Sequence, residues 1–482
     1  MDRRTLLRAT LAGAAAWTAT ACTGTPNQLP PGSTTATTTT PPPPATTTTP
    51  APPDWNALKQ SLDGALALPV DAGFATAFRL YNPAFDKRAP AAVARPASAE
   101  HVQACVRTAR DSRTPITARS GGHSYAGYSA QDNALVVDVR GLNAITVDQD
   151  STATIGAGAR LIDVYTALAA RGRALPGGTC PSVGIAGLTL GGGLGVLGRK
   201  YGLTCDSLIA AQVVTADGQL RTASADSEPD LFWALRGGGG GNFGITTEFT
   251  FRTHPAPPVL TTFDHTASNA VDLLATWQDW VSGNPPELWS NIVLSSGPSA
   301  RVGGCFVGSA AELAPLIRDL TGGRRTPTSR DHLATMRHFA GCTACEDVTR
   351  RTFTASSRVL TRPLSDPAAA VALLDGTTDL DILIDSLGGA VADIAPADTA
   401  FPHRQALASA QIYQKGANAT SVTKTRDGLA TLGASGAYVN YIDATMPDWL
   451  TAYYGDNAPR LRAVARQYDP DGVFAFEQGI KP

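Results

Sequence analysis

The sequence has almost no excess of charge of either sign: 39 lysine and arginine residues stand against 41 aspartate and glutamate residues, for a net charge of -2. This balance argues against a nucleic-acid-binding protein, which needs a basic surface to displace counterions from phosphates. Seven cysteines are too few for a fold built on disulfides. No run is both long and apolar enough to cross a bilayer as a mature helix. These absences leave a large globular protein with 47 glycines and enough chain for about three domains.

Residues 1–22 have the pattern of an export signal. Arg3 and Arg4 precede an alanine-rich apolar run over residues 9–21, which is too short to span a membrane and suits the core of a signal peptide. Paired arginines favour the twin-arginine route. Cys22 follows the run, and two outcomes stay open: a lipid anchor on Cys22, or cleavage nearby without an anchor. We expect the mature protein in the cell envelope or outside the cell.

Residues 23–54 are expected to form a linker. Threonine, proline, serine and alanine dominate the segment, and four consecutive prolines (41–44) stand between threonine runs. Such a segment cannot bury enough apolar surface to fold, and its prolines keep it extended. The folded chain is therefore expected from about residue 55 onward.

Short apolar strands alternate with amphipathic helices in the folded chain. Ser98 is expected to cap a helix whose apolar residues, Cys105 among them, recur at helical spacing, and a second such helix begins near Leu161. Three segments are expected to be strands: 115–118, 134–139 and 153–155. This alternation indicates α/β or α+β packing.

Three glycine-rich loops, at 119–127, 177–195 and 237–245, expose backbone N–H groups. Glycine lets the backbone approach a ligand closely and present its amides to phosphate oxygens. Three such loops suit a long ligand with several polar groups, such as a dinucleotide. None is a Gly-x-Gly-x-x-Gly turn with an acidic residue at the expected distance, and the P-loop lysine is missing, so those nucleotide-binding folds are disfavoured.

Together, the loops resemble the flavin-binding domain of the berberine-bridge-enzyme-like oxidases, in the vanillyl-alcohol-oxidase superfamily. The resemblance extends from about Tyr81 to the C-terminus. Its motifs are RSGGHSYAG (119–127), GTCP (178–181), the loop 237–244, DTAFPHR (398–404), YVNY (438–441), and YDP (468–470) with Phe476 and Gln478. It implies an α+β fold: a PCMH-type FAD-binding domain over 55–255, completed by 438–482, and a substrate domain over 256–437 whose antiparallel sheet is covered by helices. The flavin ring is expected at their interface, where ligand sites commonly form.

The resemblance implies an FAD attached at two points, through His123 and Cys180. Imidazole nitrogen and thiolate are good nucleophiles near neutral pH, and oxidised flavin is an electrophile. The alternative for Cys180 is a small buried apolar residue. The other expected contacts with FAD are Arg119, Ser120, Gly121, Gly122, Ser124, Tyr125, Gly127, Gly178, Thr179, Val183, Gly184, Gly187, Gly192, Gly193, Gly195, Asp206, Gly239, Asn242, Gly244, Ile245 and Asn440.

The catalytic base is expected in the C-terminal Tyr-x-Asn-Tyr segment, as Tyr441, with Tyr438 lining the same site. Tyrosine, with an ordinary pKa of about 10, needs positive charge or hydrogen bonds to its phenolate to act near neutral pH. The alternative is two ordinary strand tyrosines, which would point to opposite faces of a regular strand. Gln411, on an expected strand over 408–413, matches a family position that faces the flavin. Ser409 beside it argues against the plant alkaloid and monolignol activities.

The expected function is an exported FAD-linked oxidase. It removes a hydride from a hydroxyl-bearing carbon of a carbohydrate or natural product and passes the electrons to dioxygen, giving hydrogen peroxide. Val183 supports this choice, because it occupies a position where family members with valine react with oxygen. Two alternatives remain: a dehydrogenase that uses a quinone or protein acceptor, and a catalytically silent flavin-binding protein.

A metal site is not expected. His338, Cys342 and Cys345 with Glu346 suggest zinc, but a single Cys-x-x-Cys has no second pair to complete a tetrahedral set. In an exported protein, a Cys342–Cys345 disulfide or two unpaired thiols are the expected states.

Overall fold

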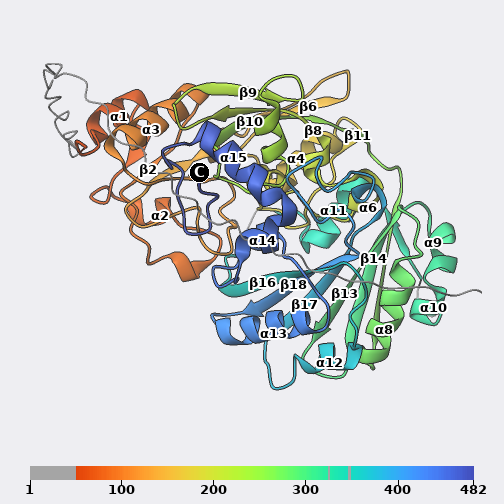
Figure 1. Cartoon of the computed structure of the whole chain (residues 1–482). Helices are drawn as coiled ribbons and strands as arrows, with labels where there is room; N and C mark the ends of the chain where they lie inside the picture. The colour runs from red at the N-terminus through yellow and green to blue at the C-terminus, as the bar shows by residue number, and fades with distance from the viewer. Residues whose placement is uncertain (1–49, 324–325, 346–348) are drawn as a thin grey trace, which may run out of the picture. The chain divides into compact units, whose positions relative to one another are not determined.

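The computed structural model describes residues 50–323, 326–345 and 349–482, so the expected signal segment, Cys22 and nearly all of the expected linker lie outside it. Within these residues the strands pair into four sheets, of four, five, two and seven strands. Figure 1 shows the seven-stranded sheet and its helices beside the part of the molecule that carries the other sheets. The α+β class expected from the sequence is confirmed.

The four-stranded sheet carries the first glycine loop at the end of one strand. Its order is β1 (Leu66–Ala67), β2 (Ala92–Ala94), β4 (Leu135–Asp138) and β3 (Ile116–Arg119). Strands β2, β4 and β3 are parallel, and β2 and β4 are buried throughout, as parallel strands covered on both faces are. Helix α3 (Ala99–Ser112) connects β2 to β3 and begins where the Ser98 hydroxyl accepts a hydrogen bond from the His101 N–H, as expected. Cys105 is buried on its inner face.

The five-stranded sheet is antiparallel and supports the other two glycine loops. Its order is β5 (Ile145–Val147), β6 (Thr152–Gly156), β10 (Ile245–Arg252), β8 (Leu208–Val214) and β9 (Leu220–Ser224). Helix α4 (Leu161–Ala169) follows β6, α5 (Ile185–Leu190) lies within the second loop, and α7 (Pro229–Leu235) precedes the third. Strands β7 (Arg173–Ala174) and β11 (His254–Pro255) form the two-stranded sheet.

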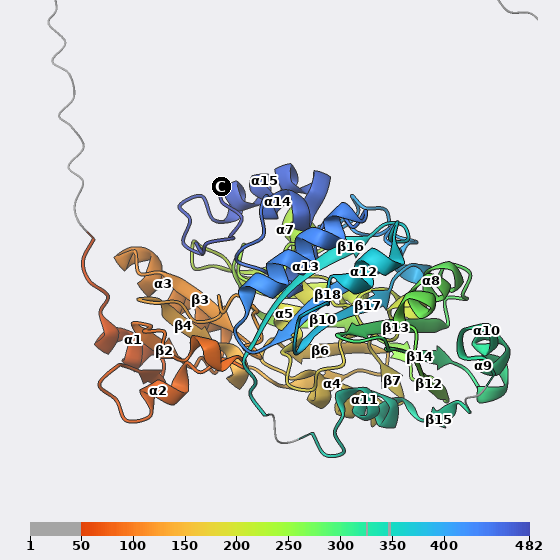
Figure 2. The same cartoon turned by 90° about the horizontal axis from the view of Figure 1, so that it is seen from below.

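The seven-stranded sheet is antiparallel, and one of its faces packs on a separate apolar core under helices. Its order is β15 (Thr328–Arg330), β12 (Leu260–Ala267), β14 (Ala300–Val307), β13 (Leu288–Ser295), β17 (Leu380–Ser386), β18 (Ala408–Lys415) and β16 (Phe353–Leu360). Helices α8 (Ala270–Val281), α12 (Pro367–Ala372) and α13 (Ala419–Thr431) line one side in Figures 1 and 2. Burial alternates along β17: Ile382 and Ile384 join the core under these helices, and Leu383 and Asp385 face the other way.

The C-terminal segment returns to the part of the molecule that the first strands build. It contains η5 (Val439–Tyr441), α14 (Trp449–Tyr454) and α15 (Ala458–Tyr468), and α15 carries three arginines, Arg460, Arg462 and Arg466. Leu461 and Phe474 of this segment belong to the same buried cluster as Phe249 and Ile155. Contacts group the whole of Pro50–Pro482 into one unit. The expected domain boundaries near 255 and 437 stay predictions.

One of the two expected states of the Cys-x-x-Cys pair is present: Cys342 and Cys345 form a disulfide, with Cα atoms 5.1 Å apart. The part of the chain that the structure describes contains no group of three histidine, cysteine or acidic residues arranged to hold a metal ion. Nor does any helix there have the length and apolar character needed to cross a membrane.

A buried histidine gives a first prediction, about stability. His332 opens α11 (His332–Ala340) and is 3 % exposed, and neither of its ring nitrogens has a hydrogen-bond partner. A buried polar group without a partner costs about 1–3 kcal/mol. We therefore expect His332→Leu to raise the free energy of unfolding by about 1 kcal/mol at pH 7.

The gain should be larger at pH 5. Burial lowers the pKa of His332 to about 4, below the value of about 6.5 in an unfolded chain. The unfolded histidine therefore takes up a proton first, and the wild type loses stability as the pH falls from about 6.5 towards 4. Urea unfolding of both proteins at the two pH values measures this. A variant less stable than wild type at both would contradict the prediction.

Candidate active site

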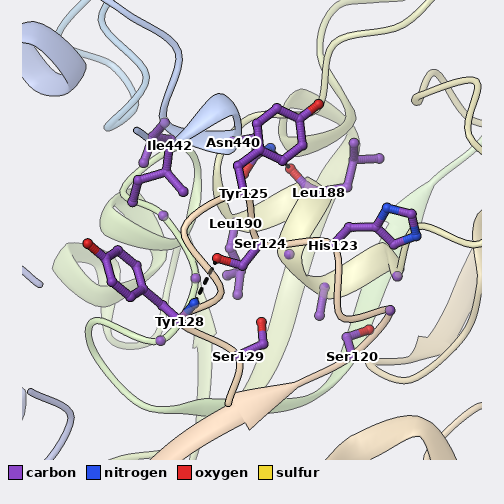
Figure 3. A pocket seen from close by; sticks show the side chains of 18 of the residues that line it. Ser120, His123, Ser124, Tyr125, Tyr128, Ser129, Leu188, Leu190, Asn440 and Ile442 are labelled. Carbon is purple, nitrogen blue, oxygen red and sulfur yellow. Dashed lines mark hydrogen bonds between the residues drawn. The ribbon is translucent and has the colours of Figure 1, made fainter. Parts of the chain in front are cut away.

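A cavity of about 530 Å³ lies where the three glycine loops, the C-terminal segment and β18 meet. Figure 3 shows the first loop running along it, with Tyr125 beside Asn440 from the C-terminal segment and His123 on the side away from Ile442. The expected site residues on its wall are Ser120, Gly121, Gly122, His123, Ser124, Tyr125, Gly178, Thr179, Cys180, Val183, Gly184, Gly187, Gly239, Asn242, Gly244, Ile245, Gln411, Tyr438, Asn440 and Tyr441. The structure therefore brings most of the predicted site together.

Glycine is required where the first two loops touch. A Cβ added at Gly121 would overlap the backbone nitrogen of Gly184, and one added at Gly184 would overlap the side chain of Ser120. The two backbones therefore approach each other more closely than any larger residue allows. This contact fixes the loop that carries His123 against the loop that carries Cys180.

His123 and Cys180 share one neighbour, Ser182. The serine Oγ lies 2.8 Å from His123 Nε2 and 3.8 Å from Cys180 Sγ. The imidazole also stacks on the ring of Tyr81, with centroids 4.0 Å apart and 20° between the planes. Burial lowers the pKa of His123 to about 4, so the imidazole is neutral near pH 7 and keeps a nucleophilic nitrogen.

The Tyr-x-Asn-Tyr segment is not a strand, which was the alternative considered from the sequence. Val439–Tyr441 form a 3-10 helix, η5, with Tyr438 at its start, so the two tyrosines are not forced to opposite faces. Their rings lie edge to face with centroids 5.0 Å apart, and Tyr441 also stacks on Tyr125. Both tyrosines therefore lie at one place on the cavity wall.

The two tyrosine hydroxyls differ in their hydrogen bonds. The oxygen of Tyr438 accepts bonds from the Gly193 N–H (2.9 Å), the Leu194 N–H (3.3 Å) and Asn440 Nδ2 (2.8 Å). These donors favour its phenolate, yet burial raises the pKa of Tyr438 to about 12. No described residue hydrogen bonds the Tyr441 hydroxyl. Burial, with the negative charge of Asp385, raises the pKa of Tyr441 well above its ordinary value.

A second cavity, of about 420 Å³, opens beside the first and shares Tyr441, Gln411 and Leu383 with it. Four of its lining residues form one row across the face of the seven-stranded sheet opposite α8: Asp264, Gly303, Asn291 and Asp385. Trp289 and Phe339, with ring centroids 5.8 Å apart, add an aromatic wall. The pair of cavities can therefore hold two ligands that meet at Tyr441.

Asp385 is a site residue that the sequence did not reveal. Desolvation raises its pKa to about 7, and Asn291 donates a hydrogen bond to it. The alternating pattern LDILIDS of β17 could have placed it on the face opposite Ile384, but no sequence pattern indicates what that face meets. The aromatic residues Tyr81, Phe353 and Tyr413 on the first cavity were missed for the same reason.

Arg119 and Asp206 do not line either cavity, and their contact with the cofactor stays a prediction. Arg119 is 1 % exposed and pairs with Asp138 at 2.5 Å, and Arg404 holds both carboxylate oxygens of Asp206, at 2.7 and 2.8 Å. A cofactor phosphate would have to compete with these buried partners.

The four remaining expected glycines also lie off the first cavity. Gly127 packs against the ring of Phe85, Gly192 and Gly193 form the turn whose N–H holds Tyr438, and Gly195 lines the second cavity. These glycines lie behind the wall of the first cavity, and their contact with the cofactor stays a prediction.

The first cavity fits FAD by its chemistry as well as its loops. Thr246 Oγ1 and Gln478 Oε1 belong to lining residues and are buried without a hydrogen-bond partner. Buried polar atoms are nearly always satisfied in folded proteins. A long polar ligand against a wall of backbone amides would satisfy them.

Comparisons with known proteins also indicate an FAD-binding protein. A family model described as "FAD binding domain" matches residues 90–224, and one described as "Berberine and berberine like" matches residues 437–481. The chain is 37% identical to the uncharacterized FAD-linked oxidoreductase YgaK of Bacillus subtilis, over 78% of this chain and 87% of that protein. It is 32% identical to chitooligosaccharide oxidase of Gibberella zeae (86% and 92% covered) and 33% identical to glucooligosaccharide oxidase of Sarocladium strictum (82% and 87% covered).

Solved structures share the fold. BBE-like 1 of Physcomitrella patens superposes with a TM-score of 0.82 at 31% identity, covering 88% of this chain and 98% of that one. A chitooligosaccharide oxidase structure gives a TM-score of 0.80 at 30% identity, with 88% and 99% covered.

The buried pair behind the second loop gives the next prediction. Replacing Asp206 by Asn leaves the buried Arg404 charge uncompensated, which costs about 3–5 kcal/mol. Asp163→Asn is the matched control, because the Arg160–Asp163 pair is 40% and 46% exposed and such pairs contribute about 0–1 kcal/mol. Denaturant unfolding should separate the two variants, and equal losses would argue against a supporting role for Asp206.

Proposed function

The chain belongs to the berberine-bridge-enzyme-like family of FAD-linked oxidoreductases, and from this we propose that it is an oxidase of a carbohydrate or of a related natural-product alcohol. The observation that carries the proposal is the second cavity, which meets the FAD-type cavity at Tyr441. Its carboxylates, amide and aromatic rings are the groups that bind hydroxyls and the apolar face of a sugar ring. The names of the oligosaccharide-oxidising relatives support the same substrate class.

We propose that FAD occupies the first cavity and is attached through His123 and Cys180. Bound there, the cofactor supplies a ring that accepts a hydride from the substrate carbon. The glycine loops offer backbone amides to its phosphates, and η5 closes the wall near Tyr441. Val183, on the same wall, supports dioxygen as the electron acceptor.

The attachment can be tested by acid denaturation. The wild-type protein should stay yellow in trichloroacetic acid, and mass analysis should find FAD on the peptides containing His123 and Cys180. His123→Ala and Cys180→Ala should each keep one bond, and the double variant should release all colour. Release of all colour from the acid-treated wild type would refute covalent attachment but not FAD binding.

The substrate proton is proposed to pass to Tyr441. Tyr441 lines both cavities and no described residue hydrogen bonds its hydroxyl, whereas the Tyr438 oxygen accepts bonds from three donors. Tyr438 thus positions Asn440 and the second loop. Because burial keeps Tyr441 protonated, its hydroxyl would give its own proton to the Asp385 carboxylate as it takes the proton of the substrate. The carbon that loses its hydride becomes a carbonyl or lactone.

Tyr441→Phe should slow anaerobic flavin reduction by about 100-fold or more, because it removes the proton acceptor, and it should leave the absorption spectrum of the bound flavin unchanged. Stopped-flow mixing with neutral oligosaccharides measures the rate. Tyr413→Phe, on the same wall, is the control and should stay near wild type. An unaltered rate in Tyr441→Phe would refute the assignment.

The acceptor and the activity itself can be tested together. Oxygen consumption that outpaces dye reduction supports an oxidase, and the reverse supports a dehydrogenase. If no oligosaccharide or aromatic alcohol bleaches the flavin under anaerobic conditions, the result would support a catalytically silent flavin-binding protein.

Export is also proposed, from the paired arginines and the apolar run that follows. The Cys342–Cys345 disulfide supports an oxidising compartment. The N-terminal sequence and mass of the mature protein would show whether Cys22 is its first residue and carries lipid.

A further inference from the structure

Ser182 holds a position that the proposed chemistry has not yet used. It lies on the second loop, is 9% exposed, and its hydroxyl lies within hydrogen-bond distance of both His123 Nε2 and Cys180 Sγ. Neither of its two partners has another side-chain hydrogen bond among the described residues. One hydroxyl therefore links the two side chains proposed to hold the cofactor.

The imidazole of His123 is restrained from two sides. Tyr81 stacks on its face, and Ser182 binds Nε2, so the ring can neither tilt nor turn freely. A neutral imidazole has one N–H and one free lone pair. When Nε2–H donates to Ser182 Oγ, the lone pair is left on Nδ1, for which the described chain offers no hydrogen-bond partner.

The same hydroxyl can act on the cysteine. A serine oxygen accepts one hydrogen bond while its own hydrogen is donated elsewhere. With the oxygen occupied by His123, the remaining hydrogen can point to Cys180 Sγ, 3.8 Å away. This arrangement holds the sulfur in place.

We propose that Ser182 is a positioning residue for flavin attachment, whose single hydroxyl sets the tautomer of His123 and orients the sulfur of Cys180. The proposal rests on the two-point attachment proposed above. His123 would bond through Nδ1 to a methyl carbon of the flavin and give up the hydrogen on Nε2, and Cys180 would bond through Sγ to a ring carbon and give up its thiol hydrogen. Each bond also releases one hydrogen from the flavin carbon, so for each bond one dioxygen takes two hydrogens and two electrons and leaves as hydrogen peroxide.

The test measures attachment and not turnover. Full-length wild type, Ser182→Ala and Ser182→Thr are produced in parallel, and total FAD and acid-stable FAD are followed over time. Losing a positioning hydrogen bond should slow attachment in Ser182→Ala by about tenfold, with total bound FAD near that of wild type. Ser182→Thr keeps the hydroxyl and should recover attachment to within about twofold.

A second pair of variants separates the two bonds. Cys180→Ala and Cys180→Ala/Ser182→Ala each leave only His123 to attach. Because Ser182 is closer to His123 than to Cys180, the double variant should attach FAD about tenfold more slowly than the single one.

Three results would overturn the proposal. Ser182→Ala could attach FAD as fast as wild type. It could lose bound FAD altogether, which would make the serine a structural support of the cavity. Wild type could itself release all FAD in acid, which would remove the two-point attachment as well; only this third result also counts against the proposed cofactor linkage.

Discussion

The site depends on one close approach, the contact of the first glycine loop with the second at Gly121 and Gly184. Without side chains at these points, two backbones pack directly and bring His123, Ser182 and Cys180 within a few ångströms. The parallel strands behind the first loop and the helix behind the second are buried, so the contact is held from both sides. A larger residue at either position would separate the two proposed tethers.

The second constraint is the packing of the C-terminal segment. Its last segment packs into the core that the first half builds, and this places η5 between the two cavities. Tyr438 is fixed there by its hydrogen bond from the Gly193 N–H, and Tyr441 lines both cavities. The chemistry therefore lies at a junction of segments far apart in sequence.

Local patterns were enough for the glycine loops, the α3 cap and most of the first cavity wall, because each depends on residues adjacent in the chain. Contacts between residues far apart in the chain could not be predicted from these patterns. Arg119 and Asp206 are charged residues next to glycine loops, and only the fold shows that each forms a buried ion pair. Asp385 lies on a strand whose opposite face the sequence identifies as apolar, while Asn291 and Tyr441, which interact with its carboxyl group, come from other segments.

The face of the seven-stranded sheet that lines the second cavity has an evolutionary consequence. Asp264, Asn291 and Asp385 alternate along their strands with residues that pack under the helices behind. If this cavity binds the proposed substrate, exchanging Asp264 or Asn291 would alter what it recognises and leave the apolar layer beneath intact. Substrate preference could then drift through single replacements on one side of the sheet, while Asp385 and Tyr441, the residues proposed to handle the proton, are inherited unchanged.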